Sequence, residues 1–102
     1  MSQAFEKFTS KKQFCVIGSI KANIGHAEAA AGIASLIKVL LQIKYGYIVP
    51  SILANETNDN INFEDSPFYL EKKLVPMKRY NNNPLRACIS SFGAGGASAH
   101  II

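Results

Sequence analysis

Residues 14–46 have the sequence FCVIGSIKANIGHAEAAAGIASLIKVLLQIKYG, and this stretch decides the fold. Its start, Phe14–Ile17, is a short apolar run rich in strand-forming side chains, which predicts a buried strand. After a loop over Lys21–Gly25, apolar side chains recur at helical spacing from about Ala27 to Tyr45, and Gly46 then supplies a left-handed cap. A strand followed by a long helix indicates that helix and strand both contribute to the fold.

The predicted helix has two unlike faces. Its first turns, Ala29–Ala34, are made of small residues, which let another backbone or a ligand come close. An apolar stripe repeats at i, i+3, i+4, i+7 and i+8 and consists of Ile33, Leu36, Ile37, Leu40 and Leu41. This is more apolar surface than 102 residues readily cover, so we expect self-association or pairing with another part of the same fold.

The rest of the chain is predicted to form shorter elements. Residues 2–9 are weakly helical, and no linker or repeat divides residues 1–102, so we expect one unit. The other predicted segments are an extended stretch at Ile48–Ile52, a polar loop at Asn55–Asp65, strands at Phe68–Leu70, Leu85–Ser91 and Ser98–Ile102, and a glycine-rich turn at Gly93–Gly96.

Composition excludes several classes of protein. The net charge of +4 comes with no nucleic-acid motif, and the basic residues around Lys72–Arg79 suit an acidic partner or a solvated edge. The N-terminus has no apolar core typical of a signal peptide, and the apolar stretch near Ile33–Ile43 is interrupted by polar residues, so no membrane partner is expected. Cys15 and Cys88 lie in apolar runs without metal-type spacing, which predicts small buried residues in a reducing, cytoplasmic compartment.

His26 is the first candidate for chemistry. We predict that it lies at or just before the N-terminus of the long helix, where the helix dipole favours the neutral imidazole. A neutral imidazole donates one hydrogen bond from a fixed nitrogen, which suits a developing oxyanion. Lys21, five residues earlier, is placed to supply a positive charge or to orient partners. On the dipole argument alone, a helix-capping histidine explains His26 better than a catalytic one.

The second candidate is the segment Ser90–His100, SSFGAGGASAH, in which three glycines occupy four positions. Glycines allow a tight turn that presents backbone N–H groups to a ligand. Because the segment has no following helix and no phosphate-loop lysine, an ordinary hairpin turn explains it better when it is taken alone.

Together the two segments resemble β-ketoacyl synthases of the polyketide-synthase type. Lys21–Gly32 resembles the KxNIGHxEAAAG motif of this family, and Ser90–His100 resembles its SSFGxGGxNAH loop. Pro50-Ser51 and Asn58–Phe63 match the pattern between them. The resemblance runs from about Gln3 to Ile102. It implies the C-terminal portion of a thiolase-like layered α/β fold, with the long helix packed on a mixed sheet.

The resemblance implies a decarboxylative Claisen condensation. In the family, a cysteine holds the acyl chain as a thioester, and two histidines promote decarboxylation of a malonyl-carrier thioester. His26 matches the second of these histidines, Lys21 matches a lysine that supports them, and the backbone N–H of Ala94 matches the second oxyanion donor. The neighbouring positions expected to bind substrate are Asn23, Gly25, Phe92, Gly93 and Gly95.

The resemblance also implies partners. They are the upstream part of the ketosynthase domain, an acyl carrier protein whose phosphopantetheine carries the substrates, and a second copy of the full enzyme in a homodimer. No metal, no directly bound cofactor and no nucleic acid are expected.

Several positions depart from the family pattern. The nucleophilic cysteine and the first histidine of the family lie upstream of the lysine motif, and Cys15 and Cys88 match neither, so we expect the chain alone to be inactive. Ala94 stands where many fatty-acid synthases have Phe, which resembles polyketide synthases served by separate acyltransferases. Ala97-Ser98 replaces a Thr/Ser-Asn pair that anchors the loop in the family.

Two other functions remain open at this point. The chain would also fit a non-catalytic half of a split or non-condensing synthase that binds a partner and an acyl carrier protein. A small basic globular protein unrelated to condensation is the third class, and the length of the first motif speaks against it.

Overall fold

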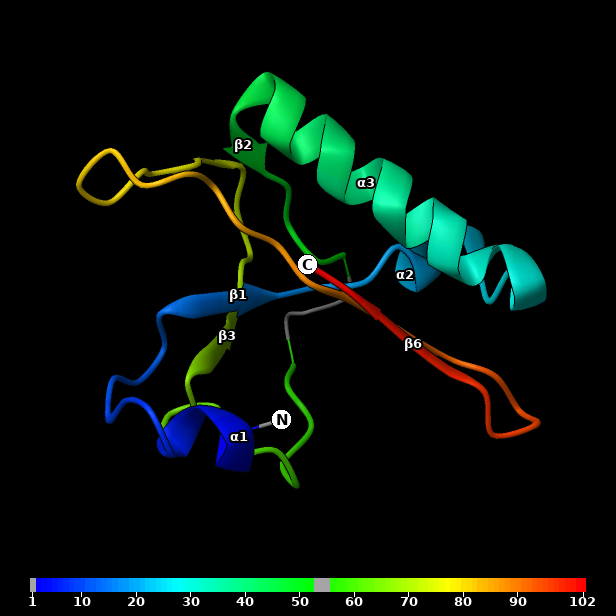
Figure 1. Ribbon diagram of the computed structural model, residues 1–102, viewed down its shortest axis with the longest axis horizontal. Coiled ribbons are helices and arrows are strands. Elements are labelled where there is room, and N and C mark those ends of the chain that lie inside the picture. Colours follow the sequence, from blue (N-terminus) through cyan, green and yellow to red (C-terminus); the bar gives the residue numbers. More distant parts are fainter. Residues whose placement is uncertain (1, 53–55) are drawn as a thin grey trace.

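The computed structural model describes residues 2–52 and 56–102, and Figure 1 shows the path of the chain. The one residue of the predicted polar loop that lies outside the described part is Asn55. The elements in chain order are α1 (Ser2–Glu6), β1 (Cys15–Ile17), α2 (Lys21–Ile24), the 3-10 helix η1 (Glu28–Ala30), α3 (Ala31–Tyr45), β2 (Tyr47–Ile48), β3 (Phe68–Leu70), β4 (Val75–Pro76), β5 (Ile89–Phe92) and β6 (Ser98–Ile101).

The strands form three separate pairs. β1 pairs with β3 in parallel, with Cys15 opposite Phe68, whereas β2 with β4 and β5 with β6 are antiparallel. The predicted α/β class and most of the predicted strands are therefore present, with both parallel and antiparallel pairing. The single mixed sheet that we expected is divided, within the described residues, into three two-stranded pieces.

The long helix begins later than its apolar pattern predicts. α3 starts at Ala31 because Glu28 has a φ of 47°, a left-handed conformation that interrupts an α-helix, and the turn after it is 3-10. The predicted loop over Lys21–Gly25 is wrong in part, since its first four residues form the short helix α2. The predicted end is confirmed, because Gly46 adopts φ 72° and ψ 26° and its N–H donates to the carbonyl of Gln42 at 2.9 Å.

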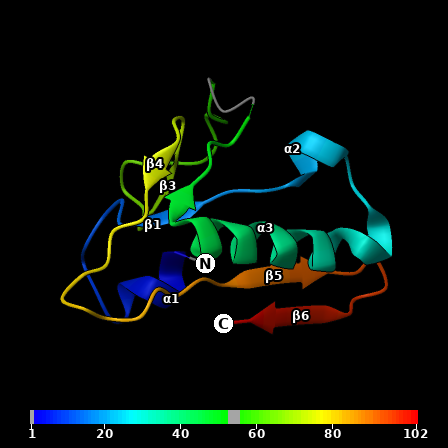
Figure 2. The same cartoon turned by 90° about the horizontal axis from the view of Figure 1, so that it is seen from above.

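α3 packs on β5 through its small residues. Ala31 is buried, and a Cβ added to Gly32 would lie 3.4 Å from the hydroxyl of Ser91 in β5. Figure 2 shows α3 running alongside β5. The close approach leaves the opposite, large-side-chain face of the helix uncovered.

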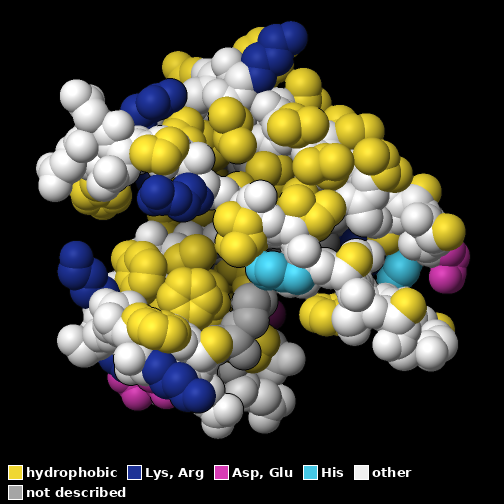
Figure 3. Space-filling view, in the orientation of Figure 1, with side chains coloured by type: hydrophobic (Ala, Val, Ile, Leu, Met, Phe, Trp, Pro, Cys, Tyr) yellow, Lys and Arg dark blue, Asp and Glu magenta, His cyan; other side chains and the backbone are white. Residues whose placement is uncertain are grey.

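The apolar stripe of α3 lies on the surface of this chain. Ile33 and Leu40 are each 55% exposed, and Ile37 is 51% exposed. Figure 3 shows hydrophobic side chains gathered over this part of the molecule. The expected excess of apolar surface is therefore confirmed, and in a chain surrounded by water it is unfavourable.

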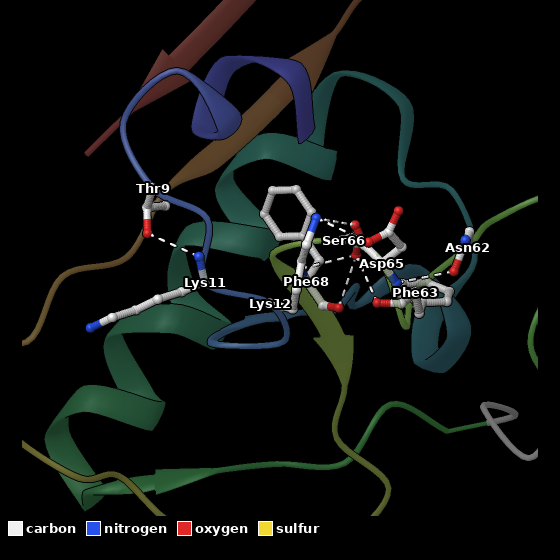
Figure 4. Close-up of polar contacts among 8 residues, drawn as sticks. All are labelled: Thr9, Lys11, Lys12, Asn62, Phe63, Asp65, Ser66 and Phe68. Carbon is white, nitrogen blue, oxygen red and sulfur yellow. Dashed lines mark hydrogen bonds and ion pairs between the residues drawn. The ribbon is translucent and has the colours of Figure 1, made fainter.

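A small aromatic and polar cluster joins the N-terminal segment to β3. The Phe5 ring packs edge-on against the rings of Phe14 and Phe68, with centroid distances of 6.1 and 5.3 Å. Buried Ser66 exchanges hydrogen bonds of 3.1 Å with the backbone of Phe68, and Figure 4 shows these contacts with the ion pair between Lys12 and Asp65. The ion pair is exposed, so the rings and Ser66 contribute most of the local stability.

The buried core is thin. Among described apolar residues, Ala31, Phe68 and Ile89 are buried and Pro67 is fully buried. The radius of gyration is 14.2 Å, whereas a compact domain of this length has about 13 Å. No helix in the part of the chain that the structure describes is long and apolar enough to cross a membrane.

Candidate active site

The first motif forms a short, internally bonded hook. Ser19 precedes α2, and its hydroxyl accepts the backbone N–H of Lys21 at 3.1 Å. The carbonyl of Lys21 in turn accepts the N–H of Gly25 at 2.8 Å. Gly25 has φ 74° and ψ −172°, a conformation that is essentially restricted to glycine, and it turns the chain sharply toward His26. The sequence Lys-x-x-x-Gly-His therefore builds a fixed turn.

His26 follows this hook, and one of its ring nitrogens is already engaged. The backbone N–H of Glu28 donates to His26 Nδ1 at 3.0 Å. A nitrogen that accepts a hydrogen bond carries no proton, so the neutral ring has its proton on Nε2. The preceding residue, Ala27, has φ −80° and ψ 24°, and this conformation orients the Glu28 N–H. The site thus presents Nε2–H as a donor.

The position of His26 relative to the long helix differs from the predicted one. We expected His26 to abut the long helix, but η1 separates it from α3, whose first residue is Ala31. The hydrogen bond from Glu28 is the local interaction that selects the tautomer.

The other predicted residues of this motif lie on the surface. Lys21 is the first residue of α2, and Asn23 lies within the same helix. Both are exposed, as are Gly25 and His26. Nothing in the described part of the chain covers these side chains, so the hook presents them outward.

The second motif forms the turn between β5 and β6. The N–H of Gly93 donates to the carbonyl of Ala97 at 2.7 Å, and the N–H of Gly96 donates to the carbonyl of Gly93 at 3.0 Å. Ala94 and Gly95 lie at the tip, and their N–H groups donate to no described residue. Phe92 precedes the turn and is 74% exposed. The turn therefore offers free amide donors at the position that the sequence predicts.

The packing of α3 brings the two motifs to one end of the molecule. Gly32 contacts Ser91, the residue before Phe92, and η1 leads directly into α3. Both ribbon views place the turn between β5 and β6 at the same end as the start of α3 (Figures 1 and 2). The two motifs thus lie toward the same end of the molecule, and their residues form an open surface rather than an enclosed site.

The two cysteines differ from their prediction in part. Cys15 is half-buried, and burial, with a smaller contribution from nearby Cys88, raises the pKa of its thiol. A raised pKa disfavours the reactive thiolate. Cys88 is exposed, which corrects the expectation that it is buried, because the adjoining face of this segment has no cover here.

The second histidine has a structural contact. His100 lies opposite Ser90 across the hairpin, and its Nδ1 is 2.9 Å from the Ser90 hydroxyl. Both histidine side chains are visible on the face shown in Figure 3. Within the described residues, no group of three or more His, Cys, Asp or Glu side chains is arranged to hold a metal ion.

Two surface pockets lie away from both motifs. One, of about 260 Å³, is lined by residues from Lys78 to Arg86, and the other, of about 410 Å³, by residues from Thr57 to Glu64. Neither contains His26 or Ala94. The chemistry-bearing side chains gather elsewhere, so we do not assign the reaction to either pocket.

Sequence reasoning missed three contributors to this geometry. They are the Glu28 backbone N–H, the Ser19 hydroxyl, and Lys38 of α3, whose Nζ donates to the carbonyl of Ser19 at 3.1 Å. A serine hydroxyl often accepts the backbone N–H two residues on, so Ser19 is a recognisable turn signal. No sequence signal marks the other two: the Glu28 contact depends on the local backbone conformation, and the Lys38 contact joins residues that folding brings together.

Comparison with known proteins identifies the family. Residues 1–55 match the family described as "Beta-ketoacyl synthase, C-terminal domain". The whole chain is 54% identical to a stretch of polyketide synthase PksM and 50% identical to a stretch of polyketide synthase PksR, both from Bacillus subtilis strain 168. The chain therefore belongs to the C-terminal domain family of the β-ketoacyl synthases.

Solved structures show the same fold. The ketosynthase from module 6 of the bacillaene synthase of Bacillus subtilis 168 matches 97% of the chain with 46% identity and a TM-score of 0.93. An oxazolomycin ketosynthase domain of Streptomyces albus JA3453 matches 96% of it with 43% identity and a TM-score of 0.85. The fold is thus the C-terminal portion of a thiolase-like ketosynthase, which confirms the expected class.

The chain is a small part of these relatives. It spans 2% of PksM and 4% of PksR, and it covers 18% of the bacillaene ketosynthase chain. The open site and the thin core agree with these proportions, because most of the atoms that surround the corresponding segment in a ketosynthase lie outside it.

Proposed function

We propose that this chain contributes the enolate-stabilising histidine of a ketosynthase that acts in polyketide biosynthesis. The reaction is the condensation of an acyl thioester with a malonyl thioester held on an acyl carrier protein. The single observation that carries the proposal is the hydrogen bond from the Glu28 N–H to His26 Nδ1, since it leaves Nε2–H as the donor. The match with ketosynthases supplies the reaction class.

The proposed role of His26 is to stabilise the negative charge that decarboxylation places on the thioester oxygen. The bond between the malonyl α-carbon and its carboxylate breaks, CO₂ leaves, and the electron pair moves onto the thioester oxygen as an enolate. Nε2–H of His26 donates to this oxygen and stabilises its negative charge. The enolate carbon then attacks the acyl-cysteine carbonyl, and the carbon–sulfur bond breaks to release the cysteine thiolate.

The glycine-rich turn is proposed to bind the carbonyl oxygen of the acyl-cysteine thioester. The free N–H of Ala94 lies at its tip and would donate to the oxygen of the acyl-cysteine thioester. Phe92 and the glycines on either side of Ala94 would line the path of the acyl chain. The exposed Lys21 would add a positive charge near the malonyl group.

The nucleophile is proposed to come from the upstream part of the ketosynthase. Cys15 has a raised thiol pKa, and Cys88 lies outside both motifs. We therefore expect the 102-residue chain alone to catalyse no condensation, and we expect activity when it is joined to that upstream part. That the parent enzyme is of the kind that uses separate acyltransferases stays a prediction, and the proposal does not depend on it.

The test separates the two half-reactions in the completed ketosynthase domain. His26→Ala should slow malonyl decarboxylation by on the order of 100- to 1000-fold, because one preorganised donor to the oxyanion is lost. Self-acylation of the cysteine should be affected far less, since its own oxyanion donors remain. His100→Ala is the matched control, and both half-reactions should stay near the parent rate.

Decarboxylation by His26→Ala at the parent rate would show that the proposed role is wrong. A completed domain that loads acyl groups but never condenses would instead support a non-condensing synthase. Condensation by the isolated chain would contradict the proposal that the nucleophile lies upstream.

A further inference from the structure

Lys38 of α3 is bonded to the segment that carries His26, although it lies twelve residues after it. Its Nζ donates to the carbonyl of Ser19 at 3.1 Å. The Ser19 hydroxyl also accepts the N–H of Lys21, so both the carbonyl and the side chain of Ser19 are hydrogen-bonded. The chain from Ser19 to His26 is then linked by the bond from Gly25 to Lys21 and by the bond from Glu28 to the imidazole.

Three separate segments meet where this contact forms. A Cβ added to Gly18 would lie 3.2 Å from the Ser51 hydroxyl and 3.9 Å from Lys38 Nζ. The N–H of Ser51 donates to the carbonyl of Glu71 at 2.9 Å, which ties this junction to the end of β3. The end of β1, the middle of α3 and the segment after β2 therefore fix the point from which α2 departs.

The lysine is an unusual choice for this position. Lys38 is half-buried, and burial lowers the pKa of its ammonium group. Within the described residues its ammonium group makes no ion pair, and its bond goes to a backbone carbonyl. A partly desolvated charge costs stability unless it is well bonded, so an apolar residue on α3 would serve simple packing better.

We propose that Lys38 is a positioning residue for the candidate active site, holding the Ser19 carbonyl so that Lys21 and His26 keep their geometry. Its catalytic consequence depends on the proposed function of His26, whereas its effect on the segment 19–28 does not. Lys38 touches neither substrate nor the reacting atoms in this proposal. It acts through the chain of hydrogen bonds that runs from Ser19 to the imidazole.

The experiment uses three lysine variants in the completed ketosynthase domain. Lys38→Met removes the donor and keeps the length of the side chain, and Lys38→Arg keeps a charged donor. Lys44→Met is the matched control, because Lys44 lies exposed in the last turn of the same helix, with its Nζ 5.6 Å from the centre of the Tyr45 ring. Each variant is measured by malonyl decarboxylation kinetics and by amide hydrogen exchange of residues 19–28.

We expect Lys38→Met to lower kcat by about 10- to 100-fold, because small misplacements of catalytic groups have effects of this size. KM for the malonyl thioester should stay within about twofold of the parent value, because the lost bond does not contact substrate. Hydrogen exchange of residues 19–28 should become faster. Lys38→Arg should restore most of both properties, and Lys44→Met should change neither.

Two results would overturn the inference. One is hydrogen exchange of residues 19–28 that is the same in Lys38→Met as in the parent. The other is a kcat that falls equally in Lys38→Arg and Lys38→Met. If the parent domain decarboxylates no malonyl thioester, the proposed function fails, and the exchange comparison still decides whether Lys38 holds the segment.

Discussion

At the residue scale, the candidate site depends on backbone conformations that few residues adopt. Gly25 has φ 74° and ψ −172°, and Glu28 has φ 47°. The first turns the chain after α2, and the second belongs to the residue whose N–H donates to His26 Nδ1. Strain of this kind persists only where neighbouring bonds hold it, and here the bonds of Lys21 and His26 do so.

Gly25→Ala should therefore destabilise the chain by about 1–3 kcal/mol, since a Cβ is disfavoured at this φ and ψ. Gly95→Ala is the control, because a Cβ there would meet no atom within 4 Å and its φ is not in the left-handed range. We expect the control to shift the free energy of unfolding by less than about 0.5 kcal/mol. Urea unfolding of the three chains at low concentration measures the difference, and equal effects would show that the Gly25 conformation is not required.

At the element scale, α3 connects every part of the site. Its small residues allow β5 to approach, so that the turn with Ala94 lies at the end where η1 and His26 are found. Its Lys38 reaches the segment before α2. One helix thus supports both sequence motifs, which are about seventy residues apart, and its packing face is as important to the site as the motifs themselves.

Substitution of Gly32 tests whether α3 packs closely on β5 at this position. Gly32→Ala would place its Cβ 3.4 Å from Ser91 Oγ, an ordinary contact, and alanine favours a helix, so stability should be unchanged or slightly higher. Gly32→Leu adds three more carbons against β5 and should cost about 1–3 kcal/mol. Thermal unfolding of both variants is the measurement, and similar stability for Gly32→Leu and the parent would show that β5 does not pack closely on α3.

At the scale of the whole molecule, the chain exposes apolar surface on α3. A ketosynthase of known structure has many more residues to cover such a surface. Only a few side chains are buried, and the large apolar side chains of α3 face solvent. A chain that covers 18% of the bacillaene ketosynthase retains the local turns and pairs but not the surroundings of its long helix. Its stability is therefore expected to be marginal when it is alone.

We expect the 102-residue chain to self-associate through the exposed face of α3 or to bind the upstream part of the domain. Ile37→Lys should weaken this association, because it places a charge in the centre of the apolar stripe at a side chain that is 51% exposed. Sedimentation at increasing concentration measures the effect, with Lys44→Met as a surface control that should associate like the parent. A parent chain that stays monomeric and unfolds cooperatively at high concentration would contradict the prediction.

The sequence by itself determined the local structures and the family. Helical periodicity with Gly46 predicted α3 and its end, strand-forming runs predicted β1 and β3, and the two motifs identified a ketosynthase segment. These features depend on neighbours in the chain, through side-chain spacing, glycine conformations and capping, which are readable from order alone.

Only the tertiary structure decided how the site is held. The contact between Lys38 and Ser19 depends on a backbone atom from another part of the fold. The start of α3 at Ala31 and the proton position on His26 depend on the local backbone conformation around Glu28, which the side-chain pattern does not reveal. The exposure of Cys88 and the division of the strands into three pairs likewise depend on what packs beside them. Sequence order encodes which side chains are available, but a hydrogen bond to a distant carbonyl or amide forms only when folding brings both atoms within about 3 Å.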